Sequence, residues 1–429
     1  MKAYYPLLSA LLVLALGIAV VSCSKGNVED KPQELPKAKV TATKYYPEDK
    51  MTAYNIEYPS KDPFGNPVTL SGAITVGDEI VDGAAPAVGV VLVNHFTVYR
   101  KDQCPSKGDL MIQKFVVGSY MVGVSADYYG FGCTEDKHQA YCVGSTNAQA
   151  SIDCLLAARE LFPSLNITVD KSKDYLFNLG YSQGGQTTVA VERLVSEKYP
   201  DIKITHSFAG GGPYDMPSTY KEMTQTDISG MPSTIISVML AFNEYYQLGF
   251  ERNRLLRGDA LAHADDWLLS KNFTQQEIDA KIGSLSFSNF ASEEIQDMNS
   301  EVSEKLMEAL EKENLAKGWK PAKGARIALI HHKEDITVPP VNQTNLYNYL
   351  VNTLGLSAND ITERTVGDIK WMDDMPAHEN GAIDFALRIF EILTTDYGFP
   401  LWFINEDTLK QMLDEALEEW YKELFGEAA

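Results

Sequence analysis

The stretch Tyr175-Leu176-Phe177-Asn178-Leu179-Gly180-Tyr181-Ser182-Gln183-Gly184-Gly185 decides the fold. Its first five residues predict a buried strand, and the pattern from 185 to 198 predicts a helix. A strand, a sharp turn and a helix around Gly-x-Ser-x-Gly hold the serine on strained backbone above a sheet. Gly180 and Gly184 suit this turn because a Cβ at either position would collide with neighbouring elements. The stretch therefore predicts a nucleophile elbow with Ser182 at its apex, against the alternative of an ordinary turn that contains a serine.

The rest of the chain alternates short apolar runs with helical patterns, which predicts a mostly parallel sheet with helices on both faces. The run Ala87–Val93 is apolar throughout, as expected of a strand buried on both faces. Further strands are expected at 52–58 and 68–75, as an antiparallel pair, and at 122–125, 202–208, 326–330 and 361–366. Further helices are expected at 147–161, 342–353 and 381–393.

Strand-like patterns stop after the sixth predicted strand. From 214 to 323 the pattern is mostly helical, including 235–248 and 293–312. A segment of ~110 residues is too long for a loop, so it predicts a helical cap inserted at this point. Its apolar side chains suit an acyl or aryl pocket, although the same stripe also suits ordinary cap core. They are Met231, Met239, Phe242, Tyr245, Tyr246 and Phe250.

The N-terminal region carries export signals. An apolar run from Leu7 to Val21 follows Lys2 and is short for a membrane span, which is typical of a signal peptide at 1–22. Val20-Val21-Ser22-Cys23 resembles a bacterial lipobox, so Cys23 is expected to be lipidated. The chain is then expected to cross the inner membrane and to be anchored in a bacterial cell envelope, at the outer membrane. An ordinary secretory signal with an incidental cysteine is the alternative.

Composition divides the remaining chain into five segments. A polar stretch with prolines predicts a linker at 23–48. The core is expected at 49–213 and 324–400, on either side of the cap at 214–323. At 401–429, apolar residues at steps of three and four predict an amphipathic helix.

The net charge of −22 repels a phosphate backbone, so nucleic acid is not an expected partner. The spacing of the cysteines after Cys23 matches no zinc site, and neither a metal nor another cofactor is expected. Export permits disulfides among Cys104, Cys133, Cys142 and Cys154, with three full pairings open. A bond between Cys133 and Cys142, on one predicted loop, is favoured, while Cys154 suits a buried thiol.

A serine hydroxyl becomes a nucleophile when a base takes its proton and an acid orients that base. Behind an elbow of this kind the acid and then the histidine follow the serine along the chain. His378 is the expected base, because it lies in a loop just before the last amphipathic helix of the core. The other histidines after Ser182 fall in a strand, in the cap, or as an adjacent pair whose rings point to opposite faces. These are His206, His263, His331 and His332.

Asp335 is the expected acid, because it lies at the carboxyl end of the first strand after the cap. Glu334 is its neighbour, and the alternative for the pair is an ordinary solvated loop. Asp373 and Asp374 are too close to His378 in sequence to be its expected partners, although contact with it is possible.

A developing oxyanion needs two backbone donors. The N–H of Gln183 is the first candidate, since it stands at the positive end of the helix dipole behind the serine. The second is expected in the turn Asn94-His95-Phe96-Thr97, from Thr97 or Phe96, with His95 in a structural role.

Together these motifs resemble the secretory-lipase branch of the α/β-hydrolase superfamily, over about residues 50 to 400. The resemblance implies hydrolysis of carboxylic esters, often acylglycerols, beneath a helical cap, here by a bacterial lipoprotein. One departure is Phe96, where the family has glycine; its side chain restricts the backbone and fills part of the pocket. The matching segments are His95-Phe96-Thr97, Asp127–Gly132 for Asp-Tyr-x-Gly-x-Gly, the elbow Gly180–Gly185, Gly210–Asp215 at the entry to the lid, Asp335 with Val338-Pro339, and His378.

Two other functions would use the same residues differently. A serine exopeptidase would share the triad and add a cap carboxylate for the substrate amine, for which Glu244 and Glu251 are candidates. A non-catalytic, lipid-anchored binding protein would retain the triad as a remnant. The leading hypothesis is a serine esterase or lipase that cleaves a small-molecule ester through Ser182, Asp335 and His378 and an acyl-enzyme intermediate.

Overall fold

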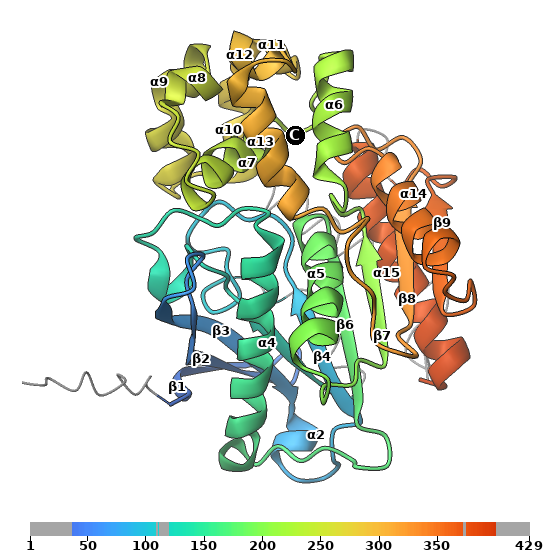
Figure 1. Ribbon diagram of the computed structural model, residues 1–429. Helices are drawn as coiled ribbons and strands as arrows, with labels where there is room; N and C mark the ends of the chain where they lie inside the picture. The colour runs from blue at the N-terminus through green and yellow to red at the C-terminus, as the bar shows by residue number, and fades with distance from the viewer. Residues whose placement is uncertain (1–36, 109, 111–119, 372–374, 400–429) are drawn as a thin grey trace, which may run out of the picture. The chain divides into compact units, whose positions relative to one another are not determined.

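A computed structural model describes residues 37–108, 110, 120–371 and 375–399. Within these residues nine strands form one sheet, in the order β1-β2-β3-β5-β4-β6-β7-β8-β9 (Figure 1). In chain order the strands are β1 (Lys39–Tyr46), β2 (Met51–Lys61), β3 (Pro67–Gly77), β4 (Gly89–Asn94), β5 (Met121–Ala126), β6 (Tyr175–Tyr181), β7 (His206–Gly210), β8 (Ile327–His332) and β9 (Ile361–Val366).

The sheet is antiparallel at one end and parallel over the rest. β1 pairs with β2, β2 with β3 and β3 with β5 in antiparallel register. Every pair from β5 through β4 to β9 is parallel. Parallel strands bring their carboxyl ends to one edge of a sheet, and loops at that edge commonly carry binding and catalytic groups. The predicted architecture and the antiparallel opening pair are confirmed.

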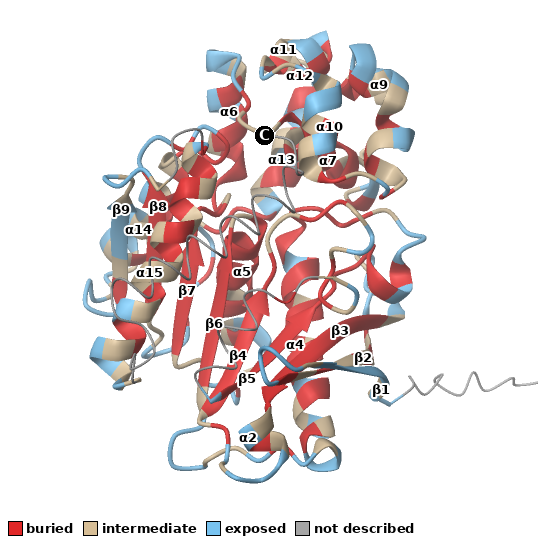
Figure 2. Cartoon of the chain, turned by 180° about the vertical axis from the view of Figure 1, so that it is seen from behind, coloured by how far each residue is buried: buried red, intermediate tan, exposed pale blue. Residues whose placement is uncertain are grey.

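Helices cover both faces of the sheet. The main ones are α4 (Gly144–Leu161), α5 (Gln183–Lys198), α14 (Val341–Tyr347) and α15 (Ala377–Tyr397); α2 (Asp78–Val81) is a single turn. On β4, Val90 and Leu92 pack in the hydrophobic core that includes α4 and α5, whereas Val91 and Val93 pack on the other face with α15. A strand covered on both faces keeps every side chain from water, which is why this stretch is apolar throughout. Figure 2 shows the central strands buried and the edge strands β1 and β9 more exposed.

Residues 211–326, all of them described, contribute helices but no strand of the sheet. Figure 1 shows these helices gathered at one end of the sheet, where the cap was predicted. A buried core that is continuous with the sheet's own includes Met239, Phe242, Tyr245 and Phe250, so the ordinary-core interpretation of the apolar stripe holds for these four. The helices are α6 (Met216–Thr226), α7 (Pro232–Tyr245), α8 (Arg252–Leu255), α9 (Gly258–Ala264) with a π-helical turn at Asp265–Leu269, α10 (Gln275–Ile282), α11 (Phe287–Phe290), α12 (Glu293–Gln296) and α13 (Glu301–Lys312).

Several sequence-based boundaries are wrong. The last core helix, expected at 381–393, is α15 (Ala377–Tyr397), so His378 lies in its first turn rather than in a loop before it. The linker predicted at 23–48 contains β1, whose mostly exposed side chains gave no apolar pattern typical of a strand. Because β1 adds one strand, the cap follows the seventh strand rather than the sixth. The strand expected at 202–208 begins only at His206. The helix expected at 293–312 is two helices, because Ser300 leaves helical geometry and its side chain caps the N-terminus of α13.

No helix in the described part of the chain is long and apolar enough to cross a bilayer. The signal peptide, Cys23 and the amphipathic helix predicted at 401–429 lie outside the described residues.

Candidate active site

Ser182 occupies the sharp turn between β6 and α5. Its backbone has φ 58° and ψ −121°, a conformation that costs about 1–3 kcal/mol for a residue with a Cβ. Its N–H donates to the carbonyl of Gly210 at 2.9 Å, which anchors the turn to β7. A Cβ on Gly180 would lie 2.3 Å from the carbonyl oxygen of Gly184, and one on Gly184 would lie 2.1 Å from that of Asn94. The turn is therefore tight enough to require both glycines, as predicted from the motif.

The structure brings Ser182, Asp335 and His378 together. His378 Nε2 lies 2.8 Å from Ser182 Oγ, although the residues are 196 positions apart in the chain. His378 Nδ1 lies 2.6 Å from Asp335 Oδ2. Asp335 Oδ1 accepts from the N–H groups of Thr337 and Val338, each at 2.9 Å. The carboxylate is thus oriented by its own loop, and it fixes Nδ1 as the protonated nitrogen of His378.

Burial and charge oppose each other at this pair. Burial alone would raise the pKa of Asp335, but the adjacent His378 and hydrogen bonds from His331 and His378 hold it well below its usual range. Burial alone would lower the pKa of His378, but the charge and hydrogen bond of Asp335 raise it above its ordinary value. Each group therefore stabilises the charged form of the other, as a base that must carry a transient positive charge requires.

The turn expected to supply an oxyanion donor lies directly beside the elbow. The Cβ position of Gly184 is 2.1 Å from the carbonyl oxygen of Asn94 and 2.9 Å from that of His95. Thr97 Oγ1 is 2.8 Å from the hydroxyl of Tyr141, and Phe96 packs in a small apolar cluster with Val98 and Phe131. The contact with Tyr141 therefore holds Thr97, and the apolar cluster holds Phe96.

His95 supports that turn from inside. Its Nδ1 lies 2.6 Å from the carbonyl oxygen of Phe96, and its Nε2 lies 3.3 Å from that of Asp127. The ring stacks on Tyr128 at 4.0 Å, and burial lowers the pKa of His95. These contacts agree with the structural role expected for it.

Gln183 is the first residue of α5, so its N–H points out of the helix start. Its side-chain amide is buried, with neither Nε2 nor Oε1 hydrogen-bonded to a described residue. The expected oxyanion role concerns only the backbone N–H of this residue.

The alternative acids and bases lie elsewhere. Glu334 is exposed, whereas Asp335 is buried, so only Asp335 faces His378. The other histidines after Ser182 have separate neighbours: His206 lies 3.2 Å from the hydroxyl of Tyr397, His263 stacks on Trp267, and His332 lies against Asn380. Asp373 and Asp374 lie outside the described residues.

His331 is a neighbour of Asp335 that the sequence did not single out. Its Nε2 is 3.4 Å from Asp335 Oδ2. The alternation of strand side chains correctly separated His331 from His332, but it did not reveal which of the two faces the acid loop. The four-residue spacing between His331 and Asp335 across a strand end was the available signal.

The favoured disulfide is wrong. Cys104, Cys133, Cys142 and Cys154 are all free thiols. Cys133 is exposed and donates to the carbonyl of Thr69 on β3 at 3.3 Å, whereas Cys142 is buried in the core beside the start of α4. Two cysteines on one loop therefore face different surroundings, and Cys154 is the buried thiol expected on its helix.

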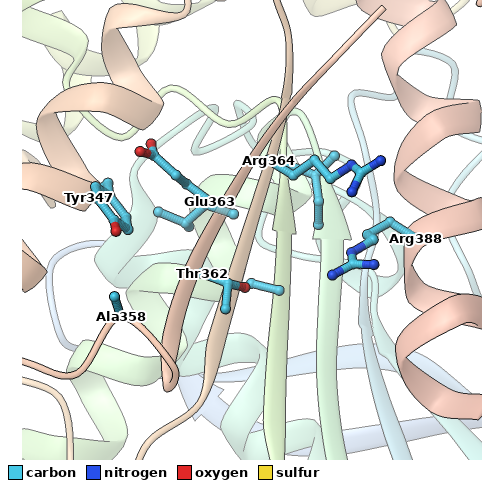
Figure 3. A pocket seen from close by; sticks show the side chains of 9 residues that line it. Tyr347, Ala358, Thr362, Glu363, Arg364 and Arg388 are labelled. Atoms are coloured by element: carbon cyan, nitrogen blue, oxygen red, sulfur yellow. The ribbon is translucent and has the colours of Figure 1, made fainter. Parts of the chain in front are cut away.

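A cavity of about 310 Å³ lies at the β9 edge of the sheet, between α14 and α15. In Figure 3, Arg364 and Arg388 lie on one side of β9, with Glu363 and Tyr347 on the other. None of Ser182, Asp335 and His378 lines this cavity, so it is separate from the candidate active site. Within the described ranges no group of three or more His, Cys, Asp or Glu side chains is placed to hold a metal ion.

A mostly parallel sheet with a serine elbow after one strand, an acid loop after a later strand and a histidine in the first turn of the last core helix defines an α/β-hydrolase. Residues 106–367 match the family model of the secretory lipases, and the chain belongs to that family. It is a carboxylic ester hydrolase, which sets aside the non-catalytic binding protein.

Solved structures show the same fold at low sequence identity. The rice cell wall degrading esterase LipA from Xanthomonas oryzae has a TM-score of 0.66 and 18% identity, covering 90% of this chain and 98% of its own. Candida antarctica lipase A in its closed state has a TM-score of 0.60 and 15% identity, covering 85% of this chain and 83% of its own. No curated protein matches the sequence at a significant level. At these identities the two structures support the fold alone.

Proposed function

We propose that the protein is a serine esterase or lipase with Ser182 as nucleophile, His378 as general base and Asp335 as the group that orients the imidazole. The observation that carries this proposal is the chain of two contacts, 2.8 Å from Ser182 Oγ to His378 Nε2 and 2.6 Å from His378 Nδ1 to Asp335 Oδ2. Both distances are within hydrogen-bonding range, so a proton has a direct route from the hydroxyl to the imidazole.

In the first half-reaction Ser182 Oγ attacks the ester carbonyl carbon while His378 Nε2 takes its proton. The carbonyl oxygen becomes an oxyanion, which the N–H of Gln183 and that of Thr97 or Phe96 stabilise. His378 then returns the proton to the alcohol, which leaves, and the acyl group remains on Ser182. In the second half-reaction His378 activates water in the same way, and the carboxylic acid is released.

The cap does not favour an exopeptidase. Glu244, one candidate for the substrate amine, is paired with His138 at 2.5 Å. Glu251, the other, lies exposed at the start of α8. Parallel rates on nitrophenyl esters and aminoacyl anilides test this choice, and we expect turnover of the esters alone.

The substrate is a small-molecule ester, and its acyl chain is open to direct measurement. A panel of nitrophenyl esters of increasing chain length tests lipid-like substrates, and cinnamoyl and acetyl-sugar esters extend it to cell-wall esters. The cell-wall esters are included because of the name of the Xanthomonas oryzae enzyme. With the best ester, a burst of nitrophenol equal to the enzyme concentration is expected if the acyl-enzyme accumulates. Ser182→Ala removes the burst and the turnover, and a Ser182→Ala protein that retains both would exclude the mechanism.

We also propose that Cys23 carries lipid and anchors the secreted enzyme in a bacterial cell envelope, at the outer membrane. The lipobox-like sequence Val20-Val21-Ser22-Cys23 supports this proposal, and the family name is consistent with secretion. Membrane fractionation tests it: the wild-type protein is expected with the membranes, and a Cys23→Ser variant is expected to lose the lipid and the membrane association. A Cys23→Ser protein that fractionates like the wild type would contradict the anchor.

A further inference from the structure

The carboxylate of Asp335 is shared by two imidazoles. Besides His378, His331 on β8 brings its Nε2 to 3.4 Å from Oδ2 and to 2.7 Å from the carbonyl oxygen of Val338. The side chains of His331 and Asp335 are 1% and 0% exposed, so water does not compete for these contacts. His331 therefore belongs to the surroundings of the acid.

The partners of His331 assign its proton. A carbonyl oxygen only accepts, so the short contact to Val338 requires the hydrogen of the neutral ring to be on Nε2. Nδ1 is buried without a hydrogen-bond partner among the described residues, so a second proton there would have no acceptor. His331 is consequently a neutral donor whose N–H points at the Val338 carbonyl and lies within reach of Asp335 Oδ2.

This N–H acts on Asp335 in two ways. Val338 also donates its own N–H to Asp335 Oδ1, so the bond from His331 to the Val338 carbonyl holds a residue that orients the carboxylate. The proximity of the same N–H to Oδ2 withdraws charge from the oxygen that faces His378 Nδ1. The position and the basicity of the carboxylate therefore both depend on His331.

We propose that His331 is a positioning residue of this hydrolase, acting through Asp335 on the base His378. The proposal rests on the proposed triad and adds a fourth side chain to it. Its chemistry is that of a fixed neutral donor: no proton leaves His331 during turnover.

The test compares His331→Leu, which removes the donor, with His331→Gln, whose amide Nε2 can donate from a similar position. His206→Leu is the matched control, since His206 is also a buried strand histidine but contacts Tyr397 rather than the acid loop. We expect kcat to fall about 10- to 100-fold in His331→Leu with KM within about twofold of wild type, part of kcat to return in His331→Gln, and His206→Leu to keep its kcat.

A pH profile separates positioning from general structural support. The charged and titratable groups that face His378 are Asp335, Glu379 and the phenol of Tyr181, and the charge on Asp335 dominates. Without the His331 donor, Oδ2 carries more charge and stabilises the imidazolium more strongly. The acid limb of kcat/KM is therefore expected to move to higher pH in His331→Leu and to return toward the wild-type position in His331→Gln.

The outcomes are distinct. Unchanged kcat and an unchanged acid limb of kcat/KM in His331→Leu would overturn the proposal. If His331→Leu does not fold, the proposal is overturned by a folded His331→Gln protein whose acid limb does not lie near the wild-type position. Loss of activity with the limb unmoved assigns His331 to structural support and also overturns it. The proposed triad is tested by different variants: ester hydrolysis that persists in Ser182→Ala or His378→Ala would contradict the triad itself.

Discussion

The hydroxyl of Tyr181 donates a hydrogen bond of 2.6 Å to the backbone carbonyl of His378, 197 residues further along the chain. The residue before the candidate nucleophile thus holds the first turn of the helix that carries the candidate base. The rings of the two residues lie 5.2 Å apart between centroids, and the Tyr181 ring also fills the space beside Gly211 and Gly381, where a Cβ would contact it. One side chain therefore ties the elbow to the start of α15.

Removal of that hydroxyl should slow the reaction without weakening substrate binding. In Tyr181→Phe the ring stays and a buried hydrogen bond worth about 1 kcal/mol is lost, so kcat is expected to fall about 3- to 10-fold with KM nearly unchanged. Tyr58→Phe is the control, because its hydroxyl also donates to a buried carbonyl, that of Ala150 at 3.1 Å, within the core. Equal kinetic losses in the two variants would argue against a specific link between Tyr181 and His378.

The pH dependence should report the pairing of His378 with Asp335. Only the neutral imidazole accepts the proton of Ser182, so kcat/KM rises as pH rises through the pKa of His378. Because Asp335 raises that pKa above the ordinary 6.5, the acid limb of wild type is expected above pH 6.5.

In Asp335→Asn burial lowers the pKa of His378 and only the weaker effect of Glu379 opposes it, so the limb is expected to move below pH 6.5. The wrong tautomer of His378 should also reduce kcat/KM by about 10³- to 10⁴-fold. Glu334→Gln serves as the control, since Glu334 is the exposed neighbour and its loss should leave the limb in place. A limb that does not shift in Asp335→Asn would contradict the assignment of the acid.

Gly184→Ala should disrupt the elbow. The new Cβ would meet the Asn94 carbonyl at 2.1 Å, a backbone atom that cannot move without displacing β4 and the turn expected to supply an oxyanion donor. We expect a loss of about 1–3 kcal/mol in the free energy of unfolding and a fall in kcat of at least about 10-fold.

Gly144→Ala is the matched control, because its Cβ would lie 3.3 Å from a side-chain oxygen of Glu313, a tight contact that a side-chain shift of a few tenths of an ångström relieves. Thermal unfolding and nitrophenyl ester kinetics measure both variants. If Gly184→Ala is as stable and as active as Gly144→Ala, the tight packing at the elbow is not required.

Lys271 should hold the cap against the core. Its ammonium donates to the carbonyls of Gly130, Glu135 and Lys137 and is largely buried, which lowers the pKa of Lys271 to about 8. Lys271→Met leaves three carbonyls without this donor, so a loss of about 2–4 kcal/mol and faster proteolysis of the cap are expected.

Lys281→Met is the control for that experiment, because Lys281 is an exposed lysine on the neighbouring helix α10. Limited proteolysis with mapping of the cut sites, together with thermal unfolding, compares the two proteins. Equal resistance to protease would show that the contacts of Lys271 do not secure the cap.

The parts of the fold that were predictable are those in which local pattern and packing agree. β4 is apolar throughout because both of its faces are covered, and α5 begins at the glycines of the elbow because the turn excludes a Cβ. β1 was not predictable, since its side chains are mostly exposed on an edge strand and its sequence shows no alternation. The break between α12 and α13 depends on one capping serine, a weaker signal than the apolar period on either side.

The candidate triad was predictable because chain order and loop position restrict the choice of acid and base. Chain order could not reveal His331, because its contact with Asp335 depends on how the acid loop turns back over β8 after leaving it. The disulfide prediction failed for a related reason: proximity along a loop does not specify which way a side chain faces, and Cys133 and Cys142 face different surroundings.

The most direct test is covalent labelling with a fluorophosphonate, which reacts only with an activated serine. Intact mass and peptide mapping are expected to show one adduct, on Ser182, in the folded wild-type protein. The rate of labelling should drop by at least about 10³-fold in His378→Ala, because the hydroxyl then has no base. A folded protein that stays unlabelled at Ser182, or labels equally fast without His378, would contradict the account.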